Sequence, residues 1–482
     1  MRFITYAYII YVMSYNDYGN YNRRPPARDG NPNGYRSAPQ DRNRAARSAK
    51  YRRVMRKQYT IIGVLALFFI AEIIVIALLA SSLSNKKDKV RDNTTVPSSD
   101  SRTTFQTTRT ETTTTTTYQV TEQLPPNSIA DTDWGPLPVC ENPVPCKHFE
   151  VRGIYSREAV RVDRCLEIAA NSQLNSIVID LKESEQVFFN TTNTTAIDCG
   201  CVNKCFNLED VVKKCHDADL HVIARIVCFK DAKLVTKFPD RAIRDKSGNI
   251  LYFKNEGKQA FASPYDKRNW DYYIELAEEA ISKGADEIQF DYVRFPTGGS
   301  TTGEKPYYGE EGTVPSKSDA INRFLQTARI RLQDKYGIPV TADIFGIAVT
   351  SSSDGDILGQ DWDTLGLTGI DSLCPMIYPS HYALGTVLNG VKFDKPDKNP
   401  HDIMFNALQV SAKVHSQPGY STVRPYVQAF TASYIGEGNY MKYEYPQINA
   451  QIKAIQENGL SEFILWNAAV DYPSGNYGGN ND

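Results

Sequence analysis

Cysteine is absent from the first 139 residues, and all nine cysteines of the 482-residue chain lie between Cys140 and Cys374. Acidic residues are scarce at the front: residues 1–57 carry thirteen Lys or Arg against three Asp. Residues 14–57 also lack a sustained apolar pattern, so we expect residues 1–57 to form a disordered basic tail. The apolar first twelve residues are not followed by a small-residue cleavage site, and a start at Met13 in place of Met1 stays open.

A single long hydrophobic run interrupts this polar front. Residues 61–83 contain one ionisable group, Glu72, and about 20 apolar residues are enough to cross a bilayer as a helix. We therefore predict a transmembrane helix within 58–84. The basic charge of 1–57 places the N-terminus in the cytoplasm by the positive-inside rule. The expected topology is single-pass type II, with the remaining chain extracellular or in the secretory lumen.

Residues 85–133 are rich in Thr and Ser and have almost nothing with which to build a core, which is typical of a stalk. Asn93, Asn190 and Asn193 each begin an N-x-Thr acceptor for N-linked glycan, in keeping with that topology. An overall charge of −2 offers no attraction for nucleic acid, and we predict no such partner.

The cysteines follow the predicted membrane segment, where an oxidising compartment allows disulfides. We expect Cys140 to pair with Cys146, and a second pairing among four clustered residues: Cys199, Cys201, Cys205 and Cys215. Cys228 and Cys374 lie in strand-like apolar runs and are predicted to be buried thiols. The spacing in the cluster is not a regular zinc pattern, and we predict neither a metal site nor a cofactor.

From Trp134 onward, apolar strand-like runs alternate with amphipathic helix-like runs, the pattern of repeated βα units. Helices are expected near 161–171, 208–217, 268–283, 318–335, 360–366, 401–415 and 444–457. Eight strands are expected at 151–155, 176–182, 221–228, 286–293, 338–345, 370–378, 423–430 and 462–467.

Eight βα units predict a (β/α)8 (TIM) barrel over 134–473, followed by a flexible tail at 474–482. An open doubly wound sheet is the other arrangement considered. It would normally carry a glycine-rich phosphate loop after its first strand, and the sequence has none.

Strand alternation predicts which polar side chains enter the barrel. In the fourth strand Gln289 and Asp291 oppose an apolar face, and in the fifth Asp343 alternates in the same way. Asp180 and Lys182 share the polar face of the second strand, and the third contributes Arg225. Active sites of such barrels lie at the carboxyl ends of the strands.

These carboxylates are candidates for the paired acids of glycoside hydrolysis. The structural alternative is that each acid only forms ion pairs with neighbouring cations. The candidate catalytic residues are Asp291, Asp343 and Asp180. The candidate substrate-binding residues are Lys182, Arg225, Gln289, Arg294, Tyr378, His381, Gln428, Trp466 and Asn467.

Six motifs, in order, carry a resemblance to a known family: HVIARIVCFKD (221–231), GADEIQFDYVRFP (284–296), VTADIFG (340–346), LCPMIYPSHY (373–382), RPYVQAF (424–430) and FILWNA (463–468). Over about residues 150–470 the chain resembles the putative glycosyl-hydrolase domain family, barrel proteins distantly similar to α-amylase-type hydrolases. By position, the resemblance implies Asp291 as nucleophile and Asp343 as acid/base. Amylases carry Glu at the latter position, so the acid's identity stays open.

We therefore expect a membrane-anchored glycoside hydrolase or transglycosylase that acts on polysaccharide or glycan. The alternative is a surface barrel that binds glycan without cleaving it. Geometry separates the two: an open cleft with Asp291 and a second carboxylate within about 10 Å favours catalysis. A mouth plugged by loops, or carboxylates locked by arginine, favours binding.

Overall fold

Eight parallel strands close into a barrel in the part of the chain that the structure, a computed structural model, describes: residues 134–309 and 314–479. Every strand predicted from the sequence is present. The barrel strands are β1 (Arg152–Tyr155), β2 (Ser176–Glu183), β5 (His221–Val227), β8 (Glu287–Asp291), β9 (Val340–Phe345), β10 (Ser372–Met376), β14 (Tyr426–Gln428) and β15 (Phe463–Trp466).

The barrel closes because β1 pairs with both β2 and β15. Every neighbouring pair around the ring is parallel, and the predicted TIM barrel is confirmed in place of the open sheet. The register places Asp180 beside Arg225 and Val227 beside Asp291 in adjacent strands. Asp180, Arg225 and Gln289 thus lie at one level in adjacent strands, and Asp291 lies two residues further towards the carboxyl ends.

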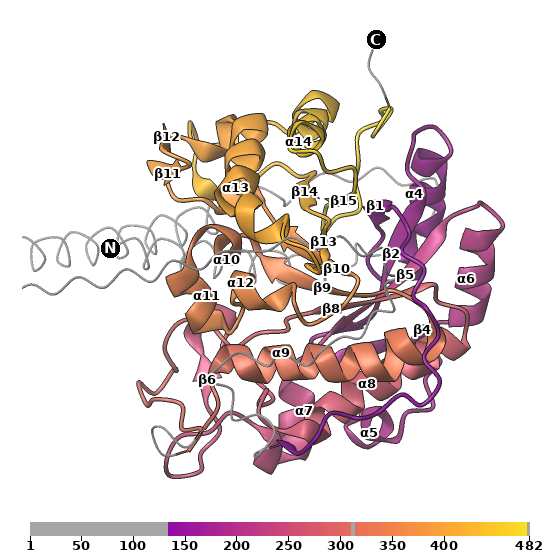
Figure 1. Cartoon of the computed structure of the whole chain (residues 1–482), viewed down its shortest axis with the longest axis vertical. Helices are drawn as coiled ribbons and strands as arrows, with labels where there is room; N and C mark the ends of the chain where they lie inside the picture. Colours follow the sequence, from indigo (N-terminus) through magenta and orange to yellow (C-terminus); the bar gives the residue numbers. More distant parts are fainter. Residues whose placement is uncertain (1–133, 310–313, 480–482) are drawn as a thin grey trace, which may run out of the picture. The chain divides into compact units, whose positions relative to one another are not determined.

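Helices surround the strands, as Figure 1 shows. Local capping explains where several of them begin. Asn207 caps α6 by accepting from the Asp210 amide, and Ser316 with Asp319 forms a capping box at α9. The main helices are α4 (Val162–Ala169), α6 (Leu208–His216), α8 (Lys267–Ser282), α9 (Lys317–Ala328), α12 (Trp362–Leu365), α13 (Pro400–His415) and α14 (Tyr445–Glu457). Two short helices, α10 (Gly346–Thr350) and α11 (Ser352–Leu358), follow β9.

Two apolar clusters stand on opposite faces of the strands. The larger one packs strands on helices and includes Ile288 and Phe290, whose ring contacts Phe324 of α9 edge-on at 5.3 Å. The smaller one fills the barrel interior with Val151, Tyr155, Val178, Ile223, Cys374, Tyr378, Tyr426 and Ile464. Gln289 lies among the latter, accepting from the Tyr426 hydroxyl at 2.6 Å, so the predicted facing of the fourth strand is confirmed.

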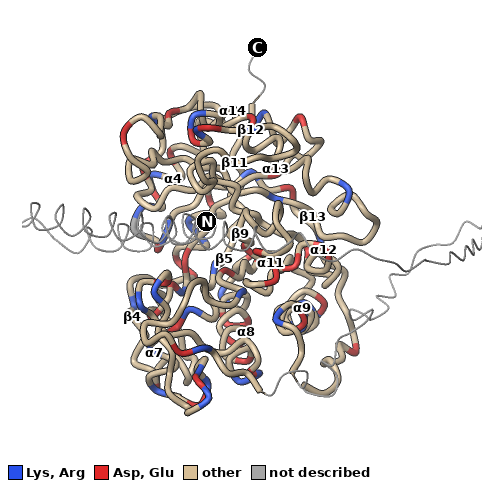
Figure 2. The backbone as a smooth tube through the Cα atoms, turned by 90° about the vertical axis from the view of Figure 1, so that its left-hand side faces the viewer, with Lys and Arg blue, Asp and Glu red and all other residues tan. Residues whose placement is uncertain are grey.

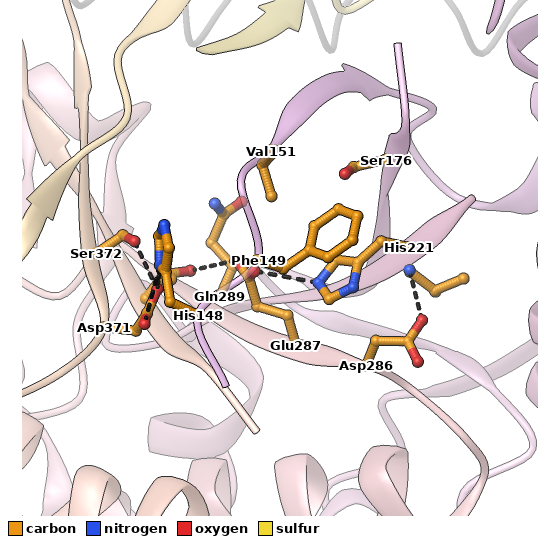
Figure 3. Close-up of polar contacts among 12 residues, drawn as sticks. His148, Phe149, Val151, Ser176, His221, Asp286, Glu287, Gln289, Asp371 and Ser372 are labelled. Atoms are coloured by element: carbon orange, nitrogen blue, oxygen red, sulfur yellow. Dashed lines mark hydrogen bonds and ion pairs between the residues drawn. The ribbon is translucent and has the colours of Figure 1, made fainter. Parts of the chain in front are cut away.

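A buried ionic cluster closes the barrel at the amino ends of its strands. Arg424 donates to Glu287 at 2.6 Å and to Glu462 at 2.8 Å. His148, from the segment before β1, lies 2.9 Å from Asp371 (Figure 3) and 3.1 Å from Glu462. Hydrogen bonds to both carboxylates raise the pKa of His148 to about 10. This end of a TIM barrel normally serves stability, and the cluster is a charged floor beneath the interior.

An insertion follows β2 and widens the sheet. β3 (Gln186–Phe189) pairs antiparallel with β2, and β4 (Val202–Phe206) runs parallel to β3. Between them α5 (Thr194–Asp198) begins at Asn193, which caps it by accepting from the Ala196 amide. The Asn193 side-chain amide also donates to Glu275 at 3.0 Å, and that of Asn190 donates to Glu209 at 3.1 Å.

The disulfide predictions are wrong in this structure, because all nine cysteines are free thiols. Cys215 is fully buried in the core. The Cys201 thiol donates to the Ala196 carbonyl at 3.2 Å, and that of Cys146 points to Asp371 Oδ1 at 3.9 Å. Cys228 and Cys374 are fully buried, as predicted.

The end of the barrel domain also differs from expectation. Residues 474–479, predicted to be flexible, pack against the barrel: Tyr477 is buried, its carbonyl accepts from the Gln173 amide, and its ring meets Tyr445. The predicted tail, membrane helix and stalk, with Glu72 and Asn93, lie outside the described residues. Within the described residues, no helix has the length and apolarity needed to cross a membrane.

Candidate active site at the barrel mouth

Four strands bring three aspartates to one arginine at their carboxyl ends. Asp180 comes from β2, Arg225 from β5, Asp291 from β8 and Asp343 from β9. All four side chains are at least nine-tenths buried. Burying several charges is expensive unless they are paired, so the side chains at this level must interact with one another.

Arg225 contacts four carboxylates at once. One terminal nitrogen, Nη1, donates to Asp180 Oδ1 at 2.5 Å and to Glu183 Oε2 at 3.1 Å. The other, Nη2, donates to Asp291 Oδ2. Nε lies 3.3 Å from Asp343 Oδ2. One cation therefore stands against four acids, and the site has a surplus of negative charge or holds protons.

Asp343 is the acid that the surroundings protonate. Burial raises the pKa of Asp343 well above its usual range, the neighbouring charge of Asp291 raises it further, and Arg225 opposes both only in part. Asp343 Oδ1 is buried and has no hydrogen-bond partner among the described residues. A protonated carboxyl with one oxygen held by Arg225 and the other unoccupied is suited to giving up a proton.

Asp180 has a hydrogen-bonded partner on the first strand. The Tyr155 hydroxyl donates to Asp180 Oδ2 at 2.5 Å. Burial raises the pKa of Asp180 to about 6, while Arg225 works against that rise. Both oxygens of Asp180 are thus engaged, by Tyr155 and Arg225, which makes it less available to a substrate than Asp343.

The backbone at the end of β8 fixes the Asp291 carboxylate. Tyr292 has φ of +52°, a left-handed conformation that is rare for a bulky residue. Its amide donates to Asp291 Oδ1 at 2.5 Å, while Arg225 holds Oδ2. Strained residues of this kind are concentrated at functional sites. The carboxylate of Asp291 is therefore oriented by contacts on both oxygens.

Aromatic rings form one wall of the mouth. Tyr378 stacks on Trp466 with ring centroids 5.5 Å apart, and Phe430 meets both rings edge-on. Tyr155 completes the wall, 6.0 Å from Trp466. Trp466 and Phe430 are half-buried, so the wall is partly exposed. Aromatic faces of this kind suit the C–H face of a sugar ring.

Several predicted substrate-binding residues are occupied elsewhere. Gln289 lies deep in the interior, and Lys182 is fully buried in an ion pair with Asp231 at 2.9 Å. Gln428 accepts from the Ser380 amide and donates to Asp397, and Asn467 donates to the carbonyls of Ala429 and Asp471. The amides of Gln428 and Asn467 thus hold loops in place.

Arg294, predicted to bind substrate, forms its ion pair with Glu256 and not with one of the three aspartates. It donates to Glu256 at 2.9 and 3.1 Å, and its guanidinium lies over the rings of Tyr292 and Phe345. Although burial opposes the charged form, Arg294 and Lys230 lower the pKa of Glu256 to about 2. The left-handed turn at Tyr292 interrupts strand alternation, so the facing of Arg294 could not be extrapolated from Asp291.

His381 lies beside the aromatic wall, its ring edge-on to Tyr378 at 4.9 Å. Burial lowers the pKa of His381 to about 3, so the imidazole is neutral across the physiological range. Its Nε2 is buried without a hydrogen-bond partner among the described residues. A neutral imidazole with an unused nitrogen can exchange a hydrogen bond with a ligand hydroxyl.

Three residues of the mouth were missing from the predicted set: Tyr155, Glu183 and Phe430. Tyr155 could have been found, because it ends the first strand two positions after Gly153 on the interior face. Glu183 follows an irregularity in the β2–β5 register, and alternation does not reach it. The short acidic pair Glu310 and Glu311 in the loop after β8 lies outside the described residues.

Carboxylates locked by arginine were expected of a barrel that binds glycan without cleaving it. Arg225 contacts four carboxylates at the mouth and so favours binding over catalysis. The protonation of Asp343 and the partly exposed aromatic wall favour catalysis. Among residues 134–309 and 314–479, no group of three or more His, Cys, Asp or Glu side chains is placed to hold a metal ion.

Comparison with protein families assigns the barrel. The family described as "Putative glycosyl hydrolase domain" matches residues 151–472, two-thirds of the chain. The chain belongs to this family. Membership supports glycoside hydrolase activity for the domain, and the resemblance seen in the six motifs is confirmed. The comparison with curated proteins found no match.

Solved structures give three further likenesses. A hypothetical protein from Ruminiclostridium thermocellum is 32% identical, over 39% of this chain and 96% of its own, with a TM-score of 0.35. An α-galactosidase from Thermus thermophilus is 12% identical, over 68% of this chain and 60% of its own, at 0.40. The PgaB (BpsB) glycoside hydrolase domain from Bordetella bronchiseptica is 12% identical, over 66% of this chain and 94% of its own, at 0.46.

Proposed function

We propose that the barrel hydrolyses glycosidic bonds in a polysaccharide or glycan, with Asp291 as the ionised carboxylate and Asp343 as the proton donor. The observation that carries the proposal is the difference between two acids held by one guanidinium. Asp291 is bound at both oxygens by hydrogen-bond donors, whereas Asp343 is buried beside it with a raised pKa and one unoccupied oxygen. Glycosidases need one ionised and one protonated carboxyl group.

The two acids would divide the reaction between them. Asp343 would protonate the leaving-group oxygen, and Asp291 would act on the anomeric carbon, directly or through a water. Asp180 accepts hydrogen bonds from Tyr155 and Arg225, and it would hold the Arg225 guanidinium in position. Trp466 and Tyr378 would support the sugar ring, and His381 would contact a hydroxyl.

Arg225 has a place in this scheme. Its Nη2 donates directly to Asp291 Oδ2, which holds the proposed nucleophile or base in position. Its contact with Asp343 is the long one, at 3.3 Å, and leaves the raised pKa in place. The guanidinium therefore treats the two acids unequally, in the direction that the chemistry needs.

The second candidate is a barrel that binds glycan without cleaving it. The specific observation in its favour is that Arg225 contacts Asp180, Glu183 and Asp291 through its terminal nitrogens, with every side chain largely buried. In that case the acids would be a structural network and the aromatic wall would be the binding surface.

We also propose that the barrel is held at a membrane by residues 61–83 in type II topology, on the extracellular or luminal side. The support comes from the sequence alone: a 23-residue apolar run after a strongly basic segment. A glycan exposed on that side would be the substrate.

The test is a screen of the full-length chain for release of reducing ends from a panel of neutral and charged polysaccharides. The Asp291→Asn variant is the matched control, because it removes the charge and keeps the shape. Hydrolysis by the wild type and none by the variant would support the proposal. Retention of a glycan by both proteins, with no bond cleaved by either, would support the binding barrel instead.

A further inference from the structure

Two loops that follow barrel strands combine into a small antiparallel platform. The loop after β5 contributes β6 (Tyr252–Phe253) and β7 (Gln259–Ala260), and the loop after β8 contributes residues 300–307. Isolated bridges join them: Arg244 pairs with Ile250 and with Tyr307, and Phe253 pairs with Ser300. Figure 1 labels β6 at the lower left.

The ladder determines which side chains share a face. Residues directly opposite in an antiparallel pair project to the same side, so Arg244, Ile250 and Tyr307 lie together. Tyr252, two positions after Ile250, shares that face. Leu251 and Phe253 point the other way and are buried, with Phe253 edge-on to Phe261 at 5.9 Å. The platform therefore has a core side and an outer side.

Two tyrosines stand on the outer side. Tyr252 is 43% exposed and Tyr307 is 38% exposed. Backbone hydrogen bonds fix both: the Tyr252 carbonyl accepts from Thr301 at 2.7 Å, and the Tyr307 amide donates to Arg244 at 2.8 Å. Lys246 lies over the Tyr307 ring, 5.4 Å from its centroid. Exposed aromatic rings on a fixed backbone lose little entropy when a ligand stacks on them.

The exposed charged residues of the segment 241–258 are all basic. Residues 241–258 contain two acids, and both are buried. Asp245 accepts a hydrogen bond from Asn249, and Glu256 accepts one from Arg294. The basic residues there are half-buried or exposed: Arg241, Arg244, Lys246, Lys254 and Lys258. Residues 300–307 add one exposed acid, Glu304, and one exposed base, Lys305.

We propose that this platform binds a polyanionic glycan, a polysaccharide whose sugars carry carboxylate groups. The proposal rests on the proposed function, because it names the class of substrate chain that the barrel mouth would act upon. Tyr252 and Tyr307 stack on sugar rings, while Lys254 and Arg244 pair with the carboxylates. A neutral glycan uses only the first of these interactions and binds more weakly.

The platform connects directly to the catalytic mouth. Glu256, in the turn between β6 and β7, binds Arg294, and Arg294 lies over the ring of Tyr292, the residue after Asp291. The Lys230 ammonium is 4.0 Å from Glu256 and 4.8 Å from the Tyr292 ring centroid. A buried ionic link thus connects the platform to Tyr292, the residue that follows Asp291.

The experiment is affinity electrophoresis of the full-length chain in gels that contain polygalacturonate, its fully methyl-esterified form, or polyglutamate. We expect retardation by polygalacturonate, several-fold less by the uncharged ester, and little by polyglutamate. The Tyr252→Ala/Tyr307→Ala double variant should bind polygalacturonate about tenfold more weakly. Lys254→Glu should weaken binding and reduce its dependence on salt.

Tyr336→Ala is the matched control, because Tyr336 is also 38% exposed with a lysine, Lys335, over its ring, but lies in the loop before β9 at the opposite end of the barrel. It should bind like the wild type. Equal retardation of the double variant and the wild type would overturn the proposal. Equal retardation by polygalacturonate and by its ester would also overturn it. If polyglutamate retards the protein as much as polygalacturonate does, the platform binds polyanions in general and the proposal of a glycan site is wrong.

The same gels separate this proposal from the proposed function. Retardation that depends on Tyr252 and Tyr307, with no glycan in the screen cleaved, supports the platform and contradicts hydrolysis. Cleavage of a neutral glycan at full rate by the double variant, with no retardation of the wild type by polygalacturonate, contradicts the platform and leaves hydrolysis standing.

Discussion

Arg225 Nε lies 3.3 Å from Asp343 Oδ2, the longest of the four contacts that this guanidinium makes with carboxylates. The two terminal nitrogens, which make the shorter contacts, face Asp180, Glu183 and Asp291. Because electrostatic stabilisation falls with distance, Asp343 gains least from the cation and most readily keeps its proton. This inequality is the physical basis for separating the roles of Asp291 and Asp343.

The first prediction concerns the proton donor. Asp343→Asn should lower kcat/KM on an unactivated glycan by about 10²–10⁴, the usual contribution of general acid catalysis. The wild-type rate should fall as pH rises through the raised pKa of Asp343, since the proton is then lost. In the variant this alkaline decline should disappear, as a pH series of kcat/KM would show.

A substrate with an activated leaving group is the internal control for that variant. A nitrophenolate departs without protonation, so an aryl glycoside should lose much less activity than the natural glycan. Equal losses on both substrates would mean that Asp343 is structural, and Asp180, whose pKa is about 6, would become the next candidate for the acid.

The second prediction concerns the charge of Arg225. Arg225→Met leaves four carboxylates at the mouth without their cation, and breaking such a buried network costs about 3–5 kcal/mol of unfolding free energy. The pKa values of Asp180 and Asp343, which burial already raises, would then rise further above their unfolded values. The folded variant would bind more protons than the unfolded chain, so its stability should fall as pH rises.

Urea unfolding at pH 5 and pH 8 measures this effect, with a larger deficit expected at pH 8. Arg268→Met is the matched control: Arg268 also pairs with two carboxylates, Asp240 and Asp266, but is 52% exposed. It should cost about 1 kcal/mol or less at either pH. If the Arg225 variant is as stable as the control, the ionic network at the mouth does not stabilise the fold.

The third prediction concerns the floor of the barrel. The folded-state pKa of His148, about 10, is above the usual value of 6.5, so protonated His148 stabilises the fold fully below pH 6.5. That contribution is lost as pH rises from 6.5 through about 10. Because His148 is 40% exposed, we expect roughly 1 kcal/mol for His148→Gln at pH 6 after allowing for solvent screening.

Thermal unfolding of wild type and His148→Gln from pH 6 to pH 10.5 tests the floor. The two melting temperatures should differ most at pH 6 and converge near pH 10.5. A constant difference across the range would mean that packing by the imidazole matters, and not its charge.

The fourth prediction concerns topology. Protease added outside intact cells should release the barrel and leave residues 1–57 protected, because the basic segment is expected in the cytoplasm. Antibodies to each end of the chain would follow the fragments. Release of the N-terminal segment with the barrel protected would contradict the type II arrangement.

Much of the fold could be predicted from the sequence, because buried parallel strands are apolar runs of characteristic length. All eight strands were found, and alternation placed Gln289 and Asp291 on the interior face. The two strands of the insertion after β2, β3 and β4, were not predicted. β3 is only four residues long and β4 is mostly exposed, so neither is an apolar run of the length expected for a buried strand.

The site was harder to predict than the fold, because alternation ends where strands end. Tyr292 turns the chain into a left-handed conformation, and Arg294 then pairs with Glu256, which lies 38 residues earlier in a different loop. Gln428 and Asn467 were predicted to bind substrate because they lie at the ends of strands. Their partners, among them Asp397 and Asp471, come from loops whose course the sequence does not determine.

The measurement that tests the account most directly is the turnover of Asp291→Asn, together with its melting temperature, on the first glycan that the wild type is found to cleave. Asn keeps the shape of the side chain but removes the charge, and its single carbonyl oxygen can accept from Arg225 or from the Tyr292 amide but not from both. The account predicts that kcat falls by several orders of magnitude while the melting temperature stays within a few degrees of wild type. Turnover at a near wild-type rate would contradict the role of Asp291, and a variant that fails to fold would assign the aspartate to the structural network of Arg225.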